Sequence, residues 1–164
     1  MESRSNVVAA AEGTPPIRPA LNVRRPRRLP VHARNDLQIG TRRRTNLLVI
    51  GDHASTRIVL DLLRLDLGGP VLTWQPGMPL IFPEPGSGAT LVLEEPLRLT
   101  AADQQRMVRW LNEVVSEVRI VSTTPEPLWP HVQSGGFDET LYYRLNPICV
   151  EVEHANSHAP IPNR

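Results

Sequence analysis

Two adjacent carboxylates, Glu94 and Glu95, end the apolar segment TLVLEE at residues 90–95. A carboxylate at the end of a buried strand can hold Mg²⁺, and its neighbour can polarise a water molecule, as phosphoryl transfer requires. An acidic strand end that is simply exposed to solvent fits the same spacing equally well. The pair is therefore a candidate catalytic site, with Glu94 as the candidate ligand of Mg²⁺.

A glycine-led turn, GDHASTRI at residues 51–58, is the second candidate site, because it joins the apolar segment NLLVI to a helical pattern. Backbone amides at such a helix N-terminus can bind phosphate. A complete phosphate-binding loop reads G-x-x-x-x-G-K followed by Ser or Thr, and here Thr56, Arg57 and Ile58 fill the last three places. Thr56 disfavours a positive φ, Arg57 is planar and bulkier than an ammonium group, and Ile58 cannot ligate a cation. The match is incomplete, and the residues that could still bind a nucleotide are Gly51, Ser55, Thr56 and Arg57.

Apolar segments of strand length alternate with helical patterns from residue 46 onward. One helix is predicted over residues 55–67, and Thr100 with Asp103 can cap another. This alternation predicts an α/β fold with a parallel sheet and helical crossovers. The predicted strands are residues 46–50, 70–74, 90–95, 118–123 and 147–152.

The segment at residues 75–89 breaks this alternation, because four prolines and three glycines in fifteen residues disfavour a helix. Fifteen residues are still enough for an extended crossover between two parallel strands. The sequence therefore predicts a crossover without a helix at this point.

The N-terminal region has a different composition, because all 18 basic residues of the chain are arginine and ten of them fall within the first 46 residues. Prolines and clustered charge predict a disordered arm over residues 1–45. The clusters Arg24–Arg28 and Arg42–Arg44 could contact nucleic acid through phosphate, or they could only solubilise the chain. A second disordered segment is predicted at residues 153–164, which leaves residues 46–152 as the core.

Hydropathy and cysteine content indicate in which compartment and redox environment the protein would fold. No apolar run approaches the roughly 20 residues of a membrane span, and no signal peptide is visible. A single cysteine, Cys149, excludes an internal disulfide and suits a reducing cytoplasm. Because it lies in the apolar segment ICV, we expect a buried thiol.

A third stretch of interest, FDETLYYRLN at residues 137–146, holds both tyrosines of the chain. Leu141, Tyr142 and Leu145 lie at helical spacing, which on its own predicts a short helix packing on the core. Together with GATLVLEEPLRLTAADQQRMVRWLNE and VRIVSTTP, this stretch resembles the AAA+ core of sigma-54-dependent transcriptional activators, which reads GGTLFLDE, VRIIAATN and FREDLYYRLN. The resemblance covers roughly residues 46–152. It implies a P-loop, AAA+-like three-layer core, a context of transcription regulation in the bacterial cytoplasm, and ATP with Mg²⁺ as cofactor.

The resemblance also shows what this chain has lost from the family pattern. Ala54 and Thr56 fall where the loop carries glycines, and Arg57 stands at the lysine position. Glu94 can still reach a cation, and Glu95 matches the catalytic glutamate. These substitutions imply that ATP binds weakly or not at all.

Two further positions argue against hydrolysis. The sensor asparagine of the family falls on Pro125, which has no polar side-chain group. Of two arginines that the family offers to the ATP of a neighbouring subunit, the first falls on Asp138 and only Arg144 remains. An arginine supplied in this way typically contributes a factor of about 10³–10⁵ in rate. The expected protein is therefore a pseudo-ATPase.

Larger parts of the family pattern are also missing. Residues 75–89 replace the helix and the GAFTGA-bearing loop with which the family touches the sigma factor, so direct contact with that factor is not expected. The helical lid and the DNA-binding helix-turn-helix are not in this sequence. The favoured hypothesis is that the protein is a non-hydrolysing interaction module. Its partners would be intact AAA+ activator subunits or further copies of itself. The alternatives are a weak ATP-binding protein with residual activity, a nucleic-acid-binding protein acting through its arginine-rich arm, and a remnant without function.

Overall fold

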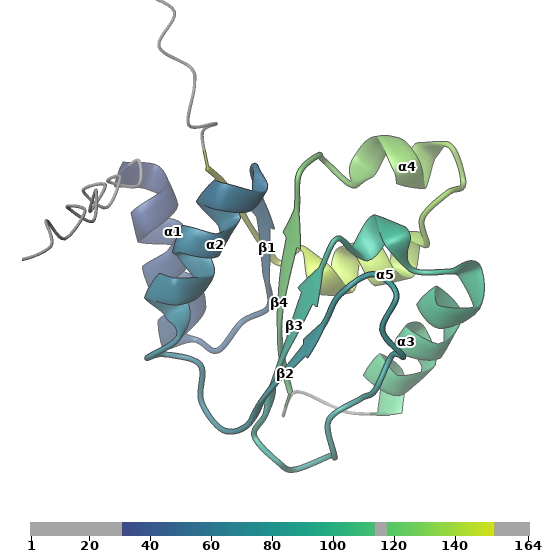
Figure 1. The fold of residues 1–164 in the computed structure, drawn as a ribbon, viewed down its shortest axis with the longest axis horizontal. Helices are drawn as coiled ribbons and strands as arrows, with labels where there is room; N and C mark the ends of the chain where they lie inside the picture. The colour runs from purple at the N-terminus through teal and green to yellow at the C-terminus, as the bar shows by residue number, and fades with distance from the viewer. Residues whose placement is uncertain (1–30, 114–117, 153–164) are drawn as a thin grey trace, which may run out of the picture.

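Five parallel strands form the centre of the computed structural model, which describes residues 31–113 and 118–152 (Figure 1). The strands lie in the order β2-β3-β4-β1-β5. Four of them fall within the segments predicted from the sequence, and β4 overlaps its segment and ends one residue beyond it. The predicted α/β fold with a parallel sheet is confirmed. The strands are β1 (Leu47–Ile50), β2 (Val71–Trp74), β3 (Thr90–Glu94), β4 (Arg119–Thr124) and β5 (Ile148–Glu151).

Helices cover both faces of this sheet and make a three-layer arrangement (Figure 1). One face carries α1 (Val31–Arg42) and α2 (His53–Leu63), and the other carries α3 (Ala101–Glu113), α4 (Trp129–Gln133) and α5 (Glu139–Leu145). A 3₁₀ turn, η1 (Pro96–Arg98), leads from β3 toward α3. The caps expected for α3 form, because the Thr100 hydroxyl accepts a hydrogen bond from the Asp103 amide at 3.1 Å and donates one to the Asp103 carboxylate at 2.8 Å.

The helix α1 corrects the predicted boundary of the N-terminal arm at residue 45. Its apolar stripe, Ala33 and Leu37, is buried with Val150 of β5, and Gly40 lets the helix approach Leu47 so closely that a Cβ would lie 2.3 Å from the leucine side chain. The sequence did not indicate this helix, because its two buried apolar residues, Ala33 and Leu37, lie among arginines and other polar residues. The disorder predicted for residues 1–30 and 153–164 falls outside the described residues.

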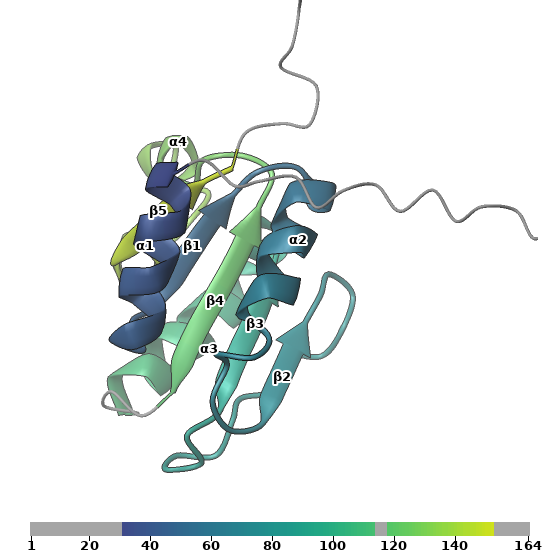
Figure 2. The same cartoon turned by 90° about the vertical axis from the view of Figure 1, so that its left-hand side faces the viewer.

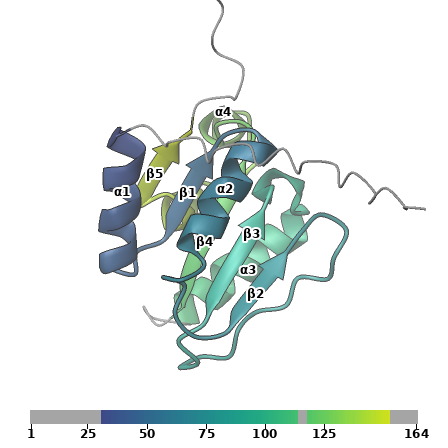
Figure 3. The same ribbon diagram turned by 60° about the vertical axis from the view of Figure 1, so that its left-hand side comes forward.

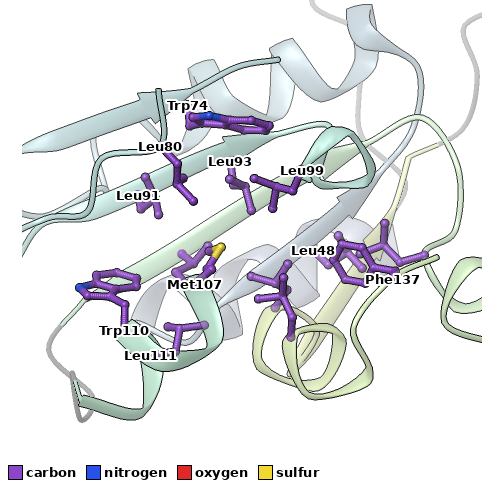
Figure 4. Close-up of a cluster of buried hydrophobic side chains, with 14 residues drawn as sticks. Leu48, Trp74, Leu80, Leu91, Leu93, Leu99, Met107, Trp110, Leu111 and Phe137 are labelled. Atoms are coloured by element: carbon purple, nitrogen blue, oxygen red, sulfur yellow. The ribbon is translucent and has the colours of Figure 1, made fainter. Parts of the chain in front are cut away.

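The larger core lies between the sheet and the layer of α3, α4 and α5 (Figure 4). Leucines of β3 and Leu48 of β1 meet Met107, Leu111 and Phe137 there. Each such side chain contributes about 1.5–3 kcal/mol when it is fully buried. This core fixes the depth and angle of the sheet, and with it the strand ends at which the candidate residues lie.

The crossover at residues 75–89 is extended, as predicted, and it adds its own side chains to this core. Phe82 stacks on Trp110 with ring centroids 4.7 Å apart and an interplanar angle of 14°. The indole N–H of Trp74 donates to the Met78 carbonyl at 2.9 Å, which holds the start of the crossover against β2. An extended chain thus packs on this face of the sheet, where a helix would ordinarily pack.

The opposite face of the sheet is covered unevenly. Figure 2 shows α1 along β5 and β1, and Figure 3 shows that no helix lies in front of β2 on this side. Val71 of β2 is accordingly 48% exposed. Within the described residues, no helix is long and apolar enough to cross a membrane.

The prediction of a buried Cys149 is wrong, because the side chain is exposed. β5 is an edge strand, and its alternation turns Val150 toward α1 and Cys149 away from it. Partial desolvation still raises the pKa of the Cys149 thiol, and the negative charge of Glu151 raises it further. An apolar run was a poor guide here, because a parallel strand is buried on both faces only when helices cover both.

Candidate functional site

A small pocket of about 40 Å³ lies at the carboxyl ends of β1, β3 and β4. It brings together most of the residues that the sequence singles out from two distant stretches, the glycine-led turn and the carboxylate pair. Ligand sites in parallel α/β sheets lie at this edge. The lining residues are Gly51, His53, Thr56, Arg57, Leu60, Glu94, Glu95, Thr123, Thr124 and Pro125.

The turn after β1 is short, because α2 begins at His53, only two residues beyond Gly51. Asp52 caps this helix: its Oδ1 accepts a hydrogen bond from the Ser55 amide at 2.7 Å, and its carbonyl accepts one from the Thr56 amide at 2.9 Å. The Thr56 hydroxyl turns back onto the helix and donates to the carbonyls of Asp52 and His53 at 3.1 and 3.2 Å. The chain's own oxygens therefore accept the hydrogen bonds that a phosphate would otherwise accept.

Gly51 has a packing role in addition to its place in the turn. Its amide donates to the Thr124 carbonyl at 2.9 Å, which ties the turn to the end of β4. A Cβ at Gly51 would lie 2.3 Å from the Val152 Cγ2 atom and 2.9 Å from the Val152 carbonyl oxygen. The absence of a side chain is what lets the segment after β5 pass this close to the turn.

The turn after β3 holds Glu95 in the left-handed region, with φ 50° and ψ 61°. This conformation costs a residue other than glycine about 1–2 kcal/mol. Hydrogen bonds fix it, because the Glu95 amide donates to the Thr123 carbonyl at 2.8 Å and its carbonyl accepts from the Arg98 amide at 2.9 Å. The Glu95 side chain is exposed, and the residue lines the pocket in this conformation.

The other carboxylate, Glu94, is partly buried at the end of β3, where its Oε1 accepts a hydrogen bond from the Gln75 side-chain amide at 3.1 Å. Gln75 directly follows β2, so this bond joins two neighbouring strand ends. Glu94 and Arg57 both line the small pocket and also a wider groove of about 610 Å³ beside it. The groove runs between α2 and the strands β2 and β3, on the face where no helix covers β2 (Figure 3).

Two of the predicted site residues are not at the pocket. Ser55 is not among its lining residues, and its amide is engaged by Asp52. Arg144 lies on α5, where its guanidinium donates to the Asn112 Oδ1 atom of α3 at 3.0 Å. Asp138, which replaces the other arginine of the family pattern, caps α5 by accepting from the Leu141 amide at 2.9 Å.

The basic clusters predicted for nucleic acid are described only in part. Arg42, Arg43 and Arg44 are exposed at the end of α1, and Arg44 donates to the Gly88 carbonyl at 2.8 Å. The cluster Arg24–Arg28 lies outside the described residues. Beneath Arg44, the Arg119 side chain is buried and donates from Nε to the Thr45 carbonyl at 3.3 Å, and burial lowers its pKa.

The small pocket adjoins the wider groove at Arg57, Leu60 and Glu94, and taken alone it is small for a nucleotide. Drug-sized ligands occupy pockets of about 300–1,000 Å³, and this one holds about 40 Å³. Of the amides at the start of α2, that of Ser55 is already bound by the Asp52 carboxylate. In the part of the chain that the structure describes, no three His, Cys, Asp or Glu residues cluster as a metal site. The carboxylates that line the pocket are those of Glu94 and Glu95.

Several residues of the pocket region had no role in the sequence analysis, namely Asp52, His53, Leu60, Thr123 and Thr124. Asp52 had a recognisable signal, because an aspartate just before an apolar helical pattern is a preferred N-cap. Placing that cap at residue 52 would have predicted a helix beginning within the glycine-led turn, and hence a turn too short to encircle a phosphate.

Comparison with known proteins gives consistent matches over this region. The family model described as "Sigma-54 interaction domain" matches residues 34–154. The transcriptional regulatory protein ZraR of Escherichia coli (strain K12) is 37% identical over 76 residues, which are 40% of this chain and 17% of ZraR. The matched region of the family model begins inside α1, which agrees with the helix found there.

Solved structures show the same fold. NtrX from Brucella abortus superposes with a TM-score of 0.59 at 20% identity, over 78% of this chain and 38% of NtrX. NtrX in complex with ATP gives a TM-score of 0.58 at 20% identity, over 74% of this chain and 36% of that protein. RuvB of Thermotoga maritima gives 0.52 at 15% identity, over 74% of this chain and 43% of RuvB. The chain thus spans well under half of the length of each of these relatives.

Proposed function

The chain belongs to the sigma-54 interaction domain family, and from this membership we propose that it acts in transcription regulation as an interaction module that does not hydrolyse ATP. Its relative ZraR is a transcriptional regulatory protein. The fold of an ATPase core is retained, and what differs is the chemistry available at the strand ends.

One observation carries the proposal: Asp52 caps the helix that should bind phosphate. The Asp52 carboxylate accepts from the Ser55 amide at 2.7 Å, and its negative charge lies where a phosphate would have to approach. A nucleotide would have to displace this cap and overcome like-charge repulsion. Arg57 is the positive group of the turn among the pocket-lining residues, and it is exposed.

The positions that the family pattern assigns to catalysis support the same conclusion. Pro125 lines the pocket where a polar sensor is expected, and Asp138 is committed to capping α5. Arg144 points to Asn112 within its own chain. An arginine acting on another subunit would first have to leave this hydrogen bond.

The partner proposed is an intact activator subunit or a second copy of this chain. NtrX and ZraR are family relatives that carry far more chain than the region matched here. A subunit that adds the α/β core without a working nucleotide site would make any mixed assembly less active. Contact with the sigma factor itself is not proposed, because residues 75–89 form a crossover packed on the core.

Nucleotide binding by the full chain tests this function. Calorimetric titration with ATP and with ADP, each with and without Mg²⁺, is expected to give no binding heat up to millimolar nucleotide. A matched variant carrying Asp52→Ala together with Ala54→Gly, Thr56→Gly, Arg57→Lys and Ile58→Thr removes the cap, restores the loop residues and is expected to gain binding. Saturable, Mg²⁺-dependent binding of ATP by the unaltered chain in the micromolar range would overturn the proposal.

Weak nucleotide binding is the second candidate function, and the strained Glu95 favours it. A residue is held in the left-handed region at a cost, and such positions concentrate at functional sites. The groove of about 610 Å³ beside the pocket also offers room for a base and ribose. If binding is found, Glu94→Ala and Arg57→Ala should each weaken it, because both residues line the pocket and the groove.

A further inference from the structure

Three aromatic side chains form a partly exposed cluster on α4 and α5, away from the pocket. The ring centroid of Trp129 lies 5.3 Å from that of Tyr142 and 6.3 Å from that of Tyr143, and the two tyrosine rings are 5.2 Å apart. Trp129 is 38% exposed and Tyr143 is 59% exposed. The Tyr142 ring is held in place by its hydroxyl, which accepts a hydrogen bond from the Asn146 side-chain amide at 2.8 Å.

Carboxylates flank this cluster. Glu139 is exposed and stands three and four residues before the tyrosines on α5, so it lies on the same side of the helix. Glu126 lies three residues before Trp129, and its side chain is 59% exposed while it contacts the His131 ring nitrogen at 3.5 Å. An aromatic surface with acidic neighbours favours a partner that is both basic and able to stack on rings.

The chain itself carries a segment of this chemistry. Residues 15–30, PPIRPALNVRRPRRLP, hold five arginines, five prolines and no acid. Proline-rich segments dock on aromatic surfaces because little conformational entropy is lost when they bind. Arginine adds cation–π stacking on Trp and Tyr and pairs with carboxylates.

The attachment point of this segment lies within reach of the cluster. α1 precedes β1 through a short connection and runs back along the sheet, so its first residue lies at the carboxyl end of the strands, where β4 leads into α4 (Figures 1 and 2). A proline-rich chain of sixteen residues can span about 50 Å. Adjacent strands are about 5 Å apart and packed layers about 10 Å, so this span is ample.

We propose that residues 15–30 dock within the same chain on the surface formed by Trp129, Tyr142, Tyr143, Glu126 and Glu139. Docking would cover the ring of Tyr143, which is 59% exposed without the segment. This docking is independent of the proposed function, since it requires no nucleotide and no second protein.

The three tryptophans allow a direct test on the full chain. Trp74 and Trp110 are buried in the larger core, whereas Trp129 is in the cluster. Each gives one indole N–H signal in a proton–nitrogen correlation spectrum, and Trp129→Phe identifies the third. In a variant with Arg24, Arg25, Arg27 and Arg28 all changed to Ala, the Trp129 signal is expected to shift while the Trp74 and Trp110 signals stay in place.

Matched variants separate docking from a general loss of charge. The pair Arg42→Ala and Arg43→Ala removes exposed arginines at the other end of α1 and should leave the Trp129 signal unchanged. Glu139→Gln should shift it, and Glu113→Gln on α3 should not. Added salt should move the Trp129 signal of the unaltered chain toward that of the arginine variant, because surface ion pairs are screened.

Two results would overturn the proposal. The first is a Trp129 signal that is the same with and without the four arginines and is insensitive to salt. The second is a shift that grows with protein concentration, which would assign the surface to a second copy of the chain. Docking within one chain is independent of concentration.

Discussion

The turns after β1 and β3 line the same pocket, but they treat their polar groups in opposite ways. In the first turn the Asp52 carboxylate accepts a hydrogen bond from the Ser55 amide, and no residue of this turn has a positive φ. The second turn holds Glu95 in a strained conformation and exposes its carboxylate. The turn after β3 thus keeps a geometry that costs free energy to maintain, whereas the turn after β1 leads into an ordinary capped helix.

This difference separates two kinds of turn. A strained residue persists only where its surroundings determine it, and here hydrogen bonds to Thr123 and Arg98 do so. A capped helix start needs only one well-placed aspartate. Substitutions in the two turns should therefore have effects of opposite sign on the free energy of unfolding.

The largest effect is expected at Gly51. Gly51→Ala places a methyl group against Val152 and should lower the free energy of unfolding by about 1–3 kcal/mol, the usual cost of overpacking. Chemical denaturation of the two proteins measures the difference. Gly136→Ala is the matched control, because its Cβ would meet atoms no closer than 3.6 Å, and it should have a small effect. Equal losses in both variants would contradict the close packing of the first turn.

Removal of the cap should have the next largest effect. Asp52→Ala is expected to lower the free energy of unfolding by about 1 kcal/mol, within the range of 0.5–2 kcal/mol for an N-cap. Thr100→Ala removes the corresponding cap of α3 and should cost a similar amount. Only Asp52→Ala frees the Ser55 amide, so only this variant should gain stability when phosphate or ADP is added. A gain with Thr100→Ala would show that the anion binds elsewhere.

At the strained turn the expected sign reverses. Glu95→Gly should raise the free energy of unfolding by about 1 kcal/mol or less, because glycine adopts positive φ without steric cost. Glu94→Gly, one residue earlier in β3, should lower it, since glycine weakens a strand. Thermal or chemical denaturation of both variants gives the comparison. Destabilisation by Glu95→Gly would mean that the carboxylate contributes more than the strain costs.

The smallest effect concerns the strand beside the first turn, where Cys149 reports on the environment of β5. Its pKa is raised by partial burial and by the charge of Glu151, and the thiolate is the form that alkylating reagents attack. Glu151→Gln removes a charge that disfavours the thiolate, so it should lower the pKa and speed alkylation at pH 8. Glu113→Gln, on α3, should not change the rate. A slower reaction in Glu151→Gln would reverse the assigned sign.

The sheet was predictable because buried parallel strands are continuous apolar runs. NLLVI and TLVLEE each identified a strand, and the four prolines after Trp74 correctly predicted an extended crossover. The cap formed by Thr100 and Asp103 was predictable for a similar reason, since it depends only on residues three apart.

What the sequence concealed depends on contacts between distant segments. α1 packs on the sheet through Ala33, Leu37 and the close approach of Gly40, and no local pattern shows that β5 would lie beneath the first two. The exposure of Cys149 follows from the place of β5 at the edge of the sheet, which periodicity cannot supply. The pocket itself required the register of β1, β3 and β4, and Glu95's left-handed backbone has no signal in its neighbours.

The uncovered strand at the other edge of the sheet has a consequence for the behaviour of the protein at high concentration. β2 exposes Val71, and no other strand among the described residues lies beyond it. Its outer backbone groups could therefore pair with another molecule and begin an aggregate. The strand is only four residues long and stands between Pro70 and Pro76, neither of which can donate a backbone hydrogen bond. These two prolines limit the number of backbone hydrogen bonds that a strand of another molecule could form with β2. Their replacement should make the protein more prone to precipitate.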